Sequence, residues 1–155
     1  MVKNVFKKLG KKQKNNKGFS LVELIVVIAI MAVLVGVLAP QLIKYVEKSR
    51  EATDIQNCDS IVTALKSYYA DKDTLPATVT VELTSSNITL KEDTAASTEP
   101  LSDSGLANAK LKGKKWSGIT ITYTPANGTA EYAITGGDNA YYEVKQENKT
   151  QIVAK

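Results

Sequence analysis

A hydroxyl and a carboxylate stand at capping distance just before a long uncharged stretch. Ser20 precedes Glu23 by three residues, and residues 24–43 carry no charged side chain. Ser-x-x-Glu is the spacing of a capping box, in which the serine caps a helix and the glutamate reaches back to free amides. A carboxylate beside so much apolar sequence is costly, by roughly 2.5–3.5 kcal/mol at mid-helix and less toward a membrane interface. On local chemistry, Glu23 is therefore predicted to cap a helix.

Catalysis has few candidate residues in this sequence. The chain contains no histidine, which is the commonest general base and metal ligand. It has no nucleophile motif, no phosphate-binding glycine loop and no cysteine cluster, and its single cysteine, Cys58, fits a small buried helix residue. Asp71 and Asp73 fit a helix end or a turn better than acid–base chemistry. We therefore expect no enzyme, no metal site and no cofactor.

Residues 24–43 are almost all Val, Ile, Leu, Ala or Met, so this stretch is apolar on every side. Helices of this kind lie in lipid or among other helices. Twenty residues span about 30 Å, the hydrocarbon thickness of a bilayer. Residues 1–18 contain seven lysines and no acid, whereas basic and acidic residues are mixed after Ile43. We expect one membrane crossing, with the lysine-rich segment in the cytoplasm and the remainder outside.

Residues 17–24 read Lys-Gly-Phe-Ser-Leu-Val-Glu-Leu, and an apolar stretch with Pro40 near its end follows them. This arrangement resembles the class III signal sequence of type IV prepilins, and the resemblance covers residues 11–71. It implies that a prepilin peptidase cuts between Gly18 and Phe19 and methylates the new Phe19 amine. It also implies that Glu23 of a neighbouring subunit neutralises the charged Phe19 amine in a low-dielectric filament. Capping and pairing by Glu23 can both hold, the first in the monomer and the second in the assembly.

The resemblance divides the chain into three parts. Residues 1–18 are a basic leader that is cleaved, residues 19–40 a hydrophobic transmembrane and assembly helix, and residues 41–155 an extracellular domain that includes the second half of the helix. Removing the leader takes away seven of the 20 basic residues and none of the 16 acidic ones, so the remainder is mildly acidic. The formal charge of +4 for the whole chain is therefore no evidence for nucleic-acid binding.

Pro40 falls inside what otherwise reads as continuous helix. Proline removes one backbone donor and crowds the carbonyl four residues back, which here belongs to Gly36, a weak helix former. The pair predicts a helix kink. Two alternatives remain: a passive bend, or a segment over residues 33–40 that unwinds, as is frequent in pilin filaments of the family that the chain resembles.

Beyond Pro40 the pattern becomes amphipathic. Apolar residues recur at steps of three and four between Ile55 and Tyr69, and we expect the charges of residues 44–54 on the other faces. The helix is predicted over residues 20–70, ending before Pro76. Strands are predicted at residues 79–83, 88–91, 119–123, 130–134 and 141–144, with an edge at 152–153 and a loop at 92–104. The predicted fold is α+β and type IV pilin-like, a long N-terminal helix with a small antiparallel sheet packed on its C-terminal half.

One basic cluster invites a functional interpretation. Lys110, Lys112, Lys114 and Lys115 precede Trp116, and basic residues with an aromatic side chain can contact DNA or another anionic surface. Runs of charge are more often solvated loops, which is the interpretation we favour here. Nucleic acid is therefore an unfavoured partner of this cluster.

The predicted function is that of a structural subunit of a type IV pilus, polymerising through its N-terminal helix into a surface filament for motility, adhesion or DNA uptake. The alternatives are a pseudopilin of a type II secretion or competence system and a single-pass membrane-anchored binding domain. The resemblance implies further copies of the chain, the prepilin peptidase, and the assembly motor and platform proteins as partners. It places the precursor in the cytoplasmic membrane and the product in an extracellular pilus. A lysine-rich leader without a cysteine pair favours a Gram-positive source.

Overall fold

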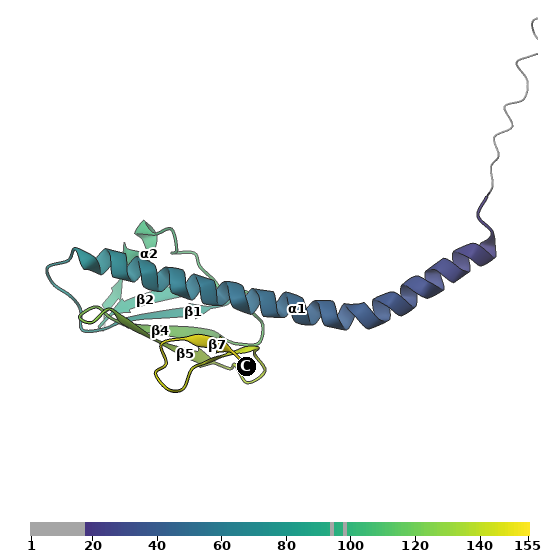
Figure 1. The fold of residues 1–155 in the computed structure, drawn as a ribbon. Helices are drawn as coiled ribbons and strands as arrows, with labels where there is room; N and C mark the ends of the chain where they lie inside the picture. The colour runs from purple at the N-terminus through teal and green to yellow at the C-terminus, as the bar shows by residue number, and fades with distance from the viewer. Residues whose placement is uncertain (1–17, 94, 98) are drawn as a thin grey trace, which may run out of the picture. The chain divides into compact units, whose positions relative to one another are not determined.

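The computed structural model describes residues 18–93, 95–97 and 99–155. The chain divides into two units, Met1–Pro40 and Gln41–Lys155, and each is considered by itself. Apart from Gly18, the predicted leader lies outside the described residues. Helix α1 (Leu21–Ala70) supplies the described part of the first unit and continues into the second (Figure 1).

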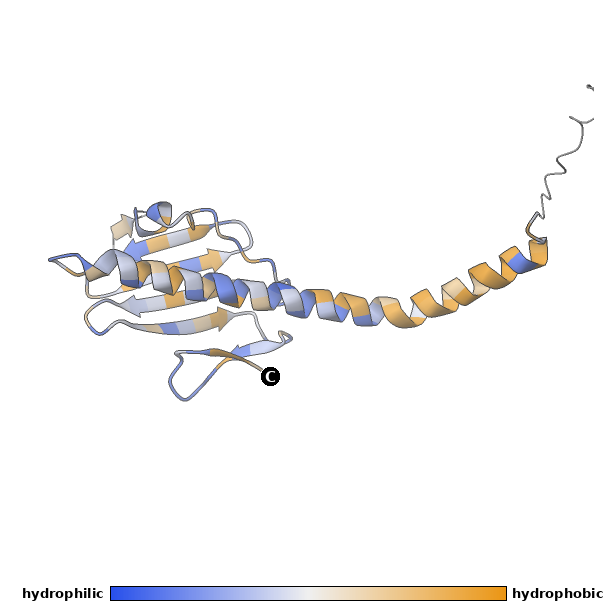
Figure 2. Ribbon diagram, turned by 45° about the horizontal axis from the view of Figure 1, so that its top comes forward, coloured by the Kyte–Doolittle hydropathy of each residue, from blue (hydrophilic) through white to orange (hydrophobic). Residues whose placement is uncertain are grey.

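The first unit presents apolar side chains on every side of α1. Phe19, Leu21 and Val33 are 88%, 72% and 68% exposed, and hydrophobic residues dominate this part of the helix in Figure 2. Among the described residues, α1 is long and apolar enough to cross a membrane. So large an exposed apolar surface is rare on a soluble monomer, so this part of α1 requires lipid or another protein surface around it.

Helix α1 is helical throughout residues 33–40, with Pro40 inside it. Residues 33–40 are thus helical in this structure of a single chain. The kink at Gly36 and Pro40 and the unwinding of residues 33–40 in a filament both stay predictions. The helix ends at Ala70, beyond which the Lys72 N–H donates to the Tyr69 carbonyl at 3.4 Å. This end agrees with the sequence prediction.

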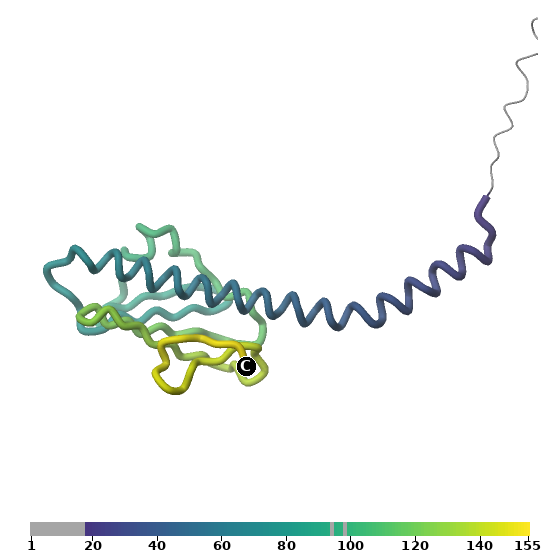
Figure 3. The backbone as a smooth tube through the Cα atoms, viewed as in Figure 1, coloured from purple at the N-terminus to yellow at the C-terminus, as the bar shows by residue number. Residues whose placement is uncertain are grey.

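Within the described residues of the second unit, five strands form an antiparallel sheet in the order β3-β2-β1-β4-β5. Figure 3 follows the path of the backbone through this unit. The strands are β1 (Val79–Thr84), β2 (Ile88–Glu92), β3 (Ala95–Ser97), β4 (Gly118–Thr124) and β5 (Thr129–Thr135). Strand β1 is central, because Val81 pairs with Leu90 of β2 on one side and with Ile121 of β4 on the other. Both hairpins expected from the alternating segments, β1–β2 and β4–β5, are present.

Two further strands, β6 (Tyr142–Val144) and β7 (Ile152–Ala154), pair with each other in an antiparallel hairpin. The Tyr132 N–H of β5 donates to the Lys149 carbonyl at 2.7 Å, which ties the edge of the larger sheet to this hairpin. A strand edge that is covered in this way is less available for pairing with another chain.

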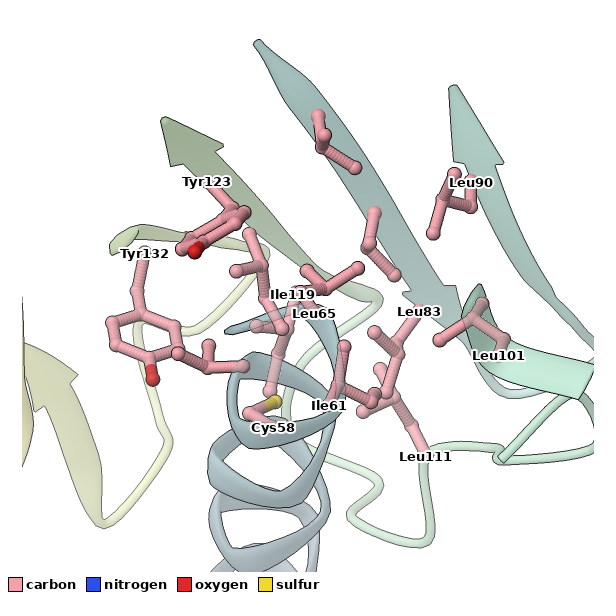
Figure 4. Close-up of a cluster of buried hydrophobic side chains, with 14 of the residues drawn as sticks. Cys58, Ile61, Leu65, Leu83, Leu90, Leu101, Leu111, Ile119, Tyr123 and Tyr132 are labelled. Atoms are coloured by element: carbon pink, nitrogen blue, oxygen red, sulfur yellow. The ribbon is translucent and has the colours of Figure 1, made fainter. Parts of the chain in front are cut away.

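The hydrophobic core lies between the second half of α1 and one face of the larger sheet (Figure 4). Ile61 and Leu65 of α1 are fully buried, as are Ile119 and Ile121 of β4. Strand β1 adds Val79, Val81 and Leu83, which alternate with more exposed residues as a strand with one buried face requires. Each such side chain contributes about 1.5–3 kcal/mol relative to exposure. The α+β, pilin-like fold predicted from the sequence is confirmed.

The prediction of a loop at residues 92–104 was partly wrong. It contains β3 and the short helix α2 (Glu99–Asp103), in addition to the end of β2. Leu101 of α2 is only 2% exposed and packs in the core, and the Ser104 hydroxyl donates to the Pro100 and Leu101 carbonyls. Burial of Pro100 and Leu101 therefore accompanies a helical turn that the polar composition of the segment does not reveal.

Candidate functional site

The junction predicted for proteolytic processing lies immediately before α1. Gly18, Phe19 and Ser20 are exposed and non-helical, and Leu21 begins the helix. Among the described residues, a Cβ atom built on Gly18 meets no other atom within 4 Å. The part of the chain that the structure describes therefore leaves space for a side chain at this position.

Glu23 makes the capping contact that its spacing from Ser20 predicts. Its Oε2 atom accepts a hydrogen bond from the Ser20 N–H at 2.8 Å, and the Leu24 N–H donates to the Ser20 carbonyl at 3.1 Å. The carboxylate thus satisfies a backbone donor at the helix N-terminus, where a negative charge also interacts favourably with the helix dipole. Glu23 is itself exposed and can be reached by another molecule.

One face of α1 in the first unit carries small side chains. Ala29, Ala32 and Gly36 follow one another at steps of three and four and are exposed, and a Cβ on Gly36 meets no atom within 4 Å. Stripes of this kind let helices approach closely, although they are common in membrane helices. Nothing in the chain itself covers this face within the described residues.

The second half of α1 carries a cluster of carboxylates that sequence reasoning assigned to the wrong face. Glu47, Glu51 and Asp54 are 8%, 0% and 0% exposed, although the charges of residues 44–54 were expected to point to solvent. Their spacing of four and three residues continues the stripe of Cys58 and Ile61, so they lie on the face that packs against the rest of the domain. Continuity with the apolar stripe was a signal in the sequence that could have identified them.

Asp54 is held by three N–H donors from one loop. Its Oδ1 accepts from the Lys112 N–H at 2.8 Å, and its Oδ2 accepts from the Gly113 N–H at 2.7 Å and from the Trp116 Nε1–H at 3.1 Å. Hydrogen bonds to an ionised acceptor are about twice as strong as neutral ones, so they offset much of the cost of burying this charge. The loop is thereby fixed onto the helix.

Glu47 and Glu51 extend the same contact along the helix. Glu47 accepts from the Lys114 N–H and forms an ion pair with Arg50, whose Nη1 lies 3.4 Å from Oε2. Glu51 Oε2 accepts from the Tyr141 N–H at 2.7 Å, which adds the segment before β6 to the contact. Together the three carboxylates, here called the docking cluster, join α1 to two segments that are distant in sequence.

One oxygen of the docking cluster has no partner among the described residues. Oε1 of Glu51 is buried and accepts no hydrogen bond there. Burial raises the pKa of this carboxyl above its ordinary value, and the negative charges of Glu47 and Asp54 raise it further. The Tyr141 N–H and the positive charge of Lys115 oppose the shift without cancelling it. The Glu51 carboxyl therefore holds its proton to a higher pH than an exposed glutamate does.

The lysine-rich loop is neither fully solvated nor a platform for stacking bases. Leu111, Gly113 and Trp116 are buried, whereas Lys112 and Lys114 between them are exposed. Because the Trp116 ring is only 4% exposed and its N–H is bound to Asp54, it is not available to stack on a nucleobase. The expected solvated loop is confirmed for the exposed lysine side chains, but not for Leu111 and Trp116, which are buried. The aromatic part of the nucleic-acid hypothesis thereby loses its basis.

The remaining residues with reactive potential are structural in their surroundings. Cys58 is fully buried in the core, and desolvation, aided by Asp54 and Asp59, raises its thiol pKa to about 12. Within the described residues, no group of three or more Cys, Asp or Glu side chains is arranged to hold a metal ion.

Comparison with known proteins identifies the N-terminal segment. Residues 13–39 match the prokaryotic N-terminal methylation motif. The chain is 36% identical over 58 residues to the type IV major pilin protein PilA of Myxococcus xanthus, covering 37% of this chain and 26% of that protein. It is 43% identical over 82 residues to the prepilin peptidase-dependent protein A of Clostridium perfringens, covering 50% of this chain and 57% of that protein.

These matches confirm the resemblance to type IV prepilins that residues 17–24 predicted. The chain spans about a quarter of the length of the first relative and a little over half of the second. No solved structure matches the chain significantly.

Proposed function

We propose, from the methylation motif over residues 13–39, that this chain is a structural subunit of a type IV pilus. In this proposal the precursor is held in the cytoplasmic membrane by α1, is cut between Gly18 and Phe19, and is methylated on the Phe19 amine. The processed chain then polymerises with further copies into a surface filament. The observation that carries the proposal is the coincidence of this motif with a helix segment that is apolar and exposed on every side.

The energetics favour a subunit that exchanges one apolar environment for another. Strongly apolar residues contribute about −0.3 to −0.6 kcal/mol each to membrane insertion. Moving residues 24–43 out of lipid therefore costs about 5 kcal/mol or more of insertion free energy. Packing against the same segment of neighbouring copies would return a comparable amount. Because the two states are then close in free energy, an assembly motor and a platform protein can drive subunits in either direction.

Glu23 is proposed to have two successive partners. In the monomer its carboxylate accepts the Ser20 N–H, which supports the capping role. In the filament, the same exposed carboxylate would pair with the methylated Phe19 amine of a neighbouring subunit, because a secondary amine stays protonated near neutral pH. A charge pair is worth more in a low-dielectric surround than in water, so it would align adjacent helices.

The proposed topology and division follow from charge and composition. The seven lysines of residues 1–18 favour a cytoplasmic N-terminus, where the peptidase would act on the leader. Residues 19–40 would form the transmembrane and assembly helix, with a kink at Gly36 and Pro40, and residues 41–155 the extracellular domain. The role is structural, with no catalysis by this chain.

A pseudopilin of a secretion or competence system is the second candidate. The motif match supports a pseudopilin as well as a pilus subunit, because it ends at residue 39 and covers only features that both classes share.

A peptidase-dependence experiment tests the proposal. The chain is expressed in cells with and without a prepilin peptidase, and sheared surface material is examined by electron microscopy. Long filaments that contain the chain and appear only with the peptidase are expected. Short structures confined to the cell envelope would favour the pseudopilin, and equal membrane-bound protein without any filament in either strain would contradict both.

A further inference from the structure

The docking cluster turns a row of lysine side chains outward at one end of the second unit. The backbone N–H groups of Lys112 and Lys114 point inward to Asp54 and Glu47, and both side chains are exposed. Lys115 is half-buried, and its Nζ lies 3.8 Å from the centre of the Tyr141 ring. Two exposed helix residues join them, so that the surface here called the basic collar consists of Lys44, Lys48, Lys112, Lys114 and Lys115.

The basic collar lies close to Ile43, the last residue of the uncharged run, which is the name used here for residues 24–43. Lys44 directly follows Ile43, and its Nζ lies 6.0 Å from the centre of the same Tyr141 ring that Lys115 covers. Lys114 is bound to Glu47, which is four residues past Ile43 and therefore about 6 Å along the helix axis. This separation is shorter than the Debye length of about 8 Å at physiological salt.

The charges of this region are segregated by depth. The three carboxylates at the same level of the helix are buried and face the N–H groups of the loop and of Tyr141, whereas the lysine side chains are exposed. The second unit therefore exposes positive side chains beside Lys44, which directly follows the uncharged residues 24–43.

An aromatic side chain completes the surface. Tyr45 is 67% exposed and lies one residue after Lys44. Tyrosine is enriched where a membrane meets water, since its ring and hydroxyl suit the two environments. Positive charge clustered beside a membrane segment attracts anionic lipid and is screened by salt.

The geometry points to a lipid-binding surface: in the membrane-held precursor, the basic collar binds the phosphate headgroups of anionic phospholipids in the bilayer that surrounds residues 24–43. The inference rests on the proposed function, because it requires residues 24–43 to lie in a membrane. Headgroup binding would hold the second unit down on the bilayer before assembly, and polymerisation would release it.

Lysine acylation in nanodiscs tests this inference on the full chain. One copy per disc is reconstituted into either purely zwitterionic phosphatidylcholine or a phosphatidylcholine–phosphatidylglycerol mixture, and the acylation rate of each lysine is read by mass spectrometry. In the mixed discs we expect Lys112 and Lys114 to react at about one third of their rate in the zwitterionic discs, or more slowly still. High salt should abolish this difference. Lys66 and Lys91, which are exposed away from the collar, should react equally in both discs.

A pair of double variants provides the matched control. Lys112→Gln with Lys114→Gln should remove the lipid-dependent protection of Lys44 and Lys115, whereas Lys66→Gln with Lys91→Gln should preserve it. Lys112 and Lys114 donate to the docking cluster through their backbone N–H groups, so the first double variant should leave the loop attached to α1. An unchanged melting temperature in detergent would establish this.

Equal acylation rates in both kinds of disc would overturn the inference. Protection that appears only with several copies per disc would assign the collar to subunit contacts instead, and protection in zwitterionic discs by added DNA but not by anionic lipid would assign it to nucleic acid. Either result also overturns the inference. Failure of the chain to stay in any disc would contradict the proposed membrane-held precursor itself, which distinguishes the two failures.

Discussion

The backbone N–H of Gly113 donates to Oδ2 of Asp54 at 2.7 Å, across 59 residues of sequence. Both residues are buried, so this bond connects the loop before β4 to the second half of α1 without contact with water. A side chain at position 113 would occupy the space through which the carboxylate reaches the backbone. Attachment of the loop to the helix thus depends on a residue without a side chain.

Gly113→Ala should destabilise the domain. An added Cβ would lie 2.7 Å from Trp116 Nε1, 3.0 Å from Asp54 Oδ2 and 3.1 Å from Glu51 Cγ, so several packed groups must move. We expect a loss of about 1–3 kcal/mol in the free energy of unfolding, measured by chemical denaturation of the full chain in detergent. Gly118→Ala is the control, because its nearest neighbour, the Leu83 carbonyl, lies at 3.6 Å in ordinary contact. Equal stability of the two variants would contradict this account of the loop.

The stability of the domain should depend on pH through Glu51. Its pKa is raised in the folded state, so the folded chain holds this proton to higher pH than the unfolded chain does. The stabilisation is complete below the unfolded pKa, near the model-compound value of 4.5, and is lost as pH rises through the folded pKa. Glu51→Gln should therefore lose less stability than the wild type when pH is raised from acidic to neutral.

Urea midpoints determined at a series of pH values measure this difference. Glu143→Gln is the matched control, since Glu143 is exposed and lies two residues from Tyr141. Its pH profile should follow that of the wild type. A Glu51→Gln profile parallel to the wild type would mean that Glu51 does not carry the expected pH dependence.

Glu23→Gln should separate the two roles proposed for this residue. The glutamine amide oxygen can still accept the Ser20 N–H, whereas the negative charge is lost. We expect membrane insertion as in the wild type and a strongly reduced filament yield, similar to that of Glu23→Ala. The measurement is the amount of sheared filament per membrane-bound subunit. A normal yield from the glutamine variant would reduce Glu23 to a helix cap.

Substitutions at Gly18 should act only through the peptidase. Since a Cβ there meets nothing within 4 Å, Gly18→Ala is expected to fold and to be processed. Gly18→Trp should accumulate as unprocessed precursor while the thermal unfolding of the second unit is unchanged. Immunoblotting for the precursor and calorimetry of the purified chain measure the two quantities. A lowered melting temperature would show that Gly18 has a structural role.

The helix and most strands could be predicted because their periodic patterns are local. The apolar steps between Ile55 and Tyr69 and the alternating segments of β1 and β4 are visible within a few residues. The burial of the docking cluster could not be predicted from a local pattern. A charged residue on a helix is expected to face solvent unless the N–H groups that bind it are known. Those donors, the N–H groups of Lys112, Lys114 and Tyr141, lie 58, 67 and 90 residues from their acceptors.

The candidate processing site was predictable for a different reason. Gly18, Phe19 and Glu23 lie within the motif match over residues 13–39, and a motif of this kind is written in consecutive residues. In the lysine-rich loop, the exposure of the lysines was predictable, whereas the burial of Leu111 and Trp116 among them was not, because the charged residues conceal the alternation. The fold around it, not its composition, determines which groups of the loop reach solvent.

The most direct test of the central claim is the mass of the N-terminal peptide of protein sheared from the cell surface. The account predicts a peptide that begins at Phe19 and carries one methyl group on its amine. A peptide that begins at Met1 or at Pro40 would contradict it, because the apolar run would then be a plain anchor or a discarded signal.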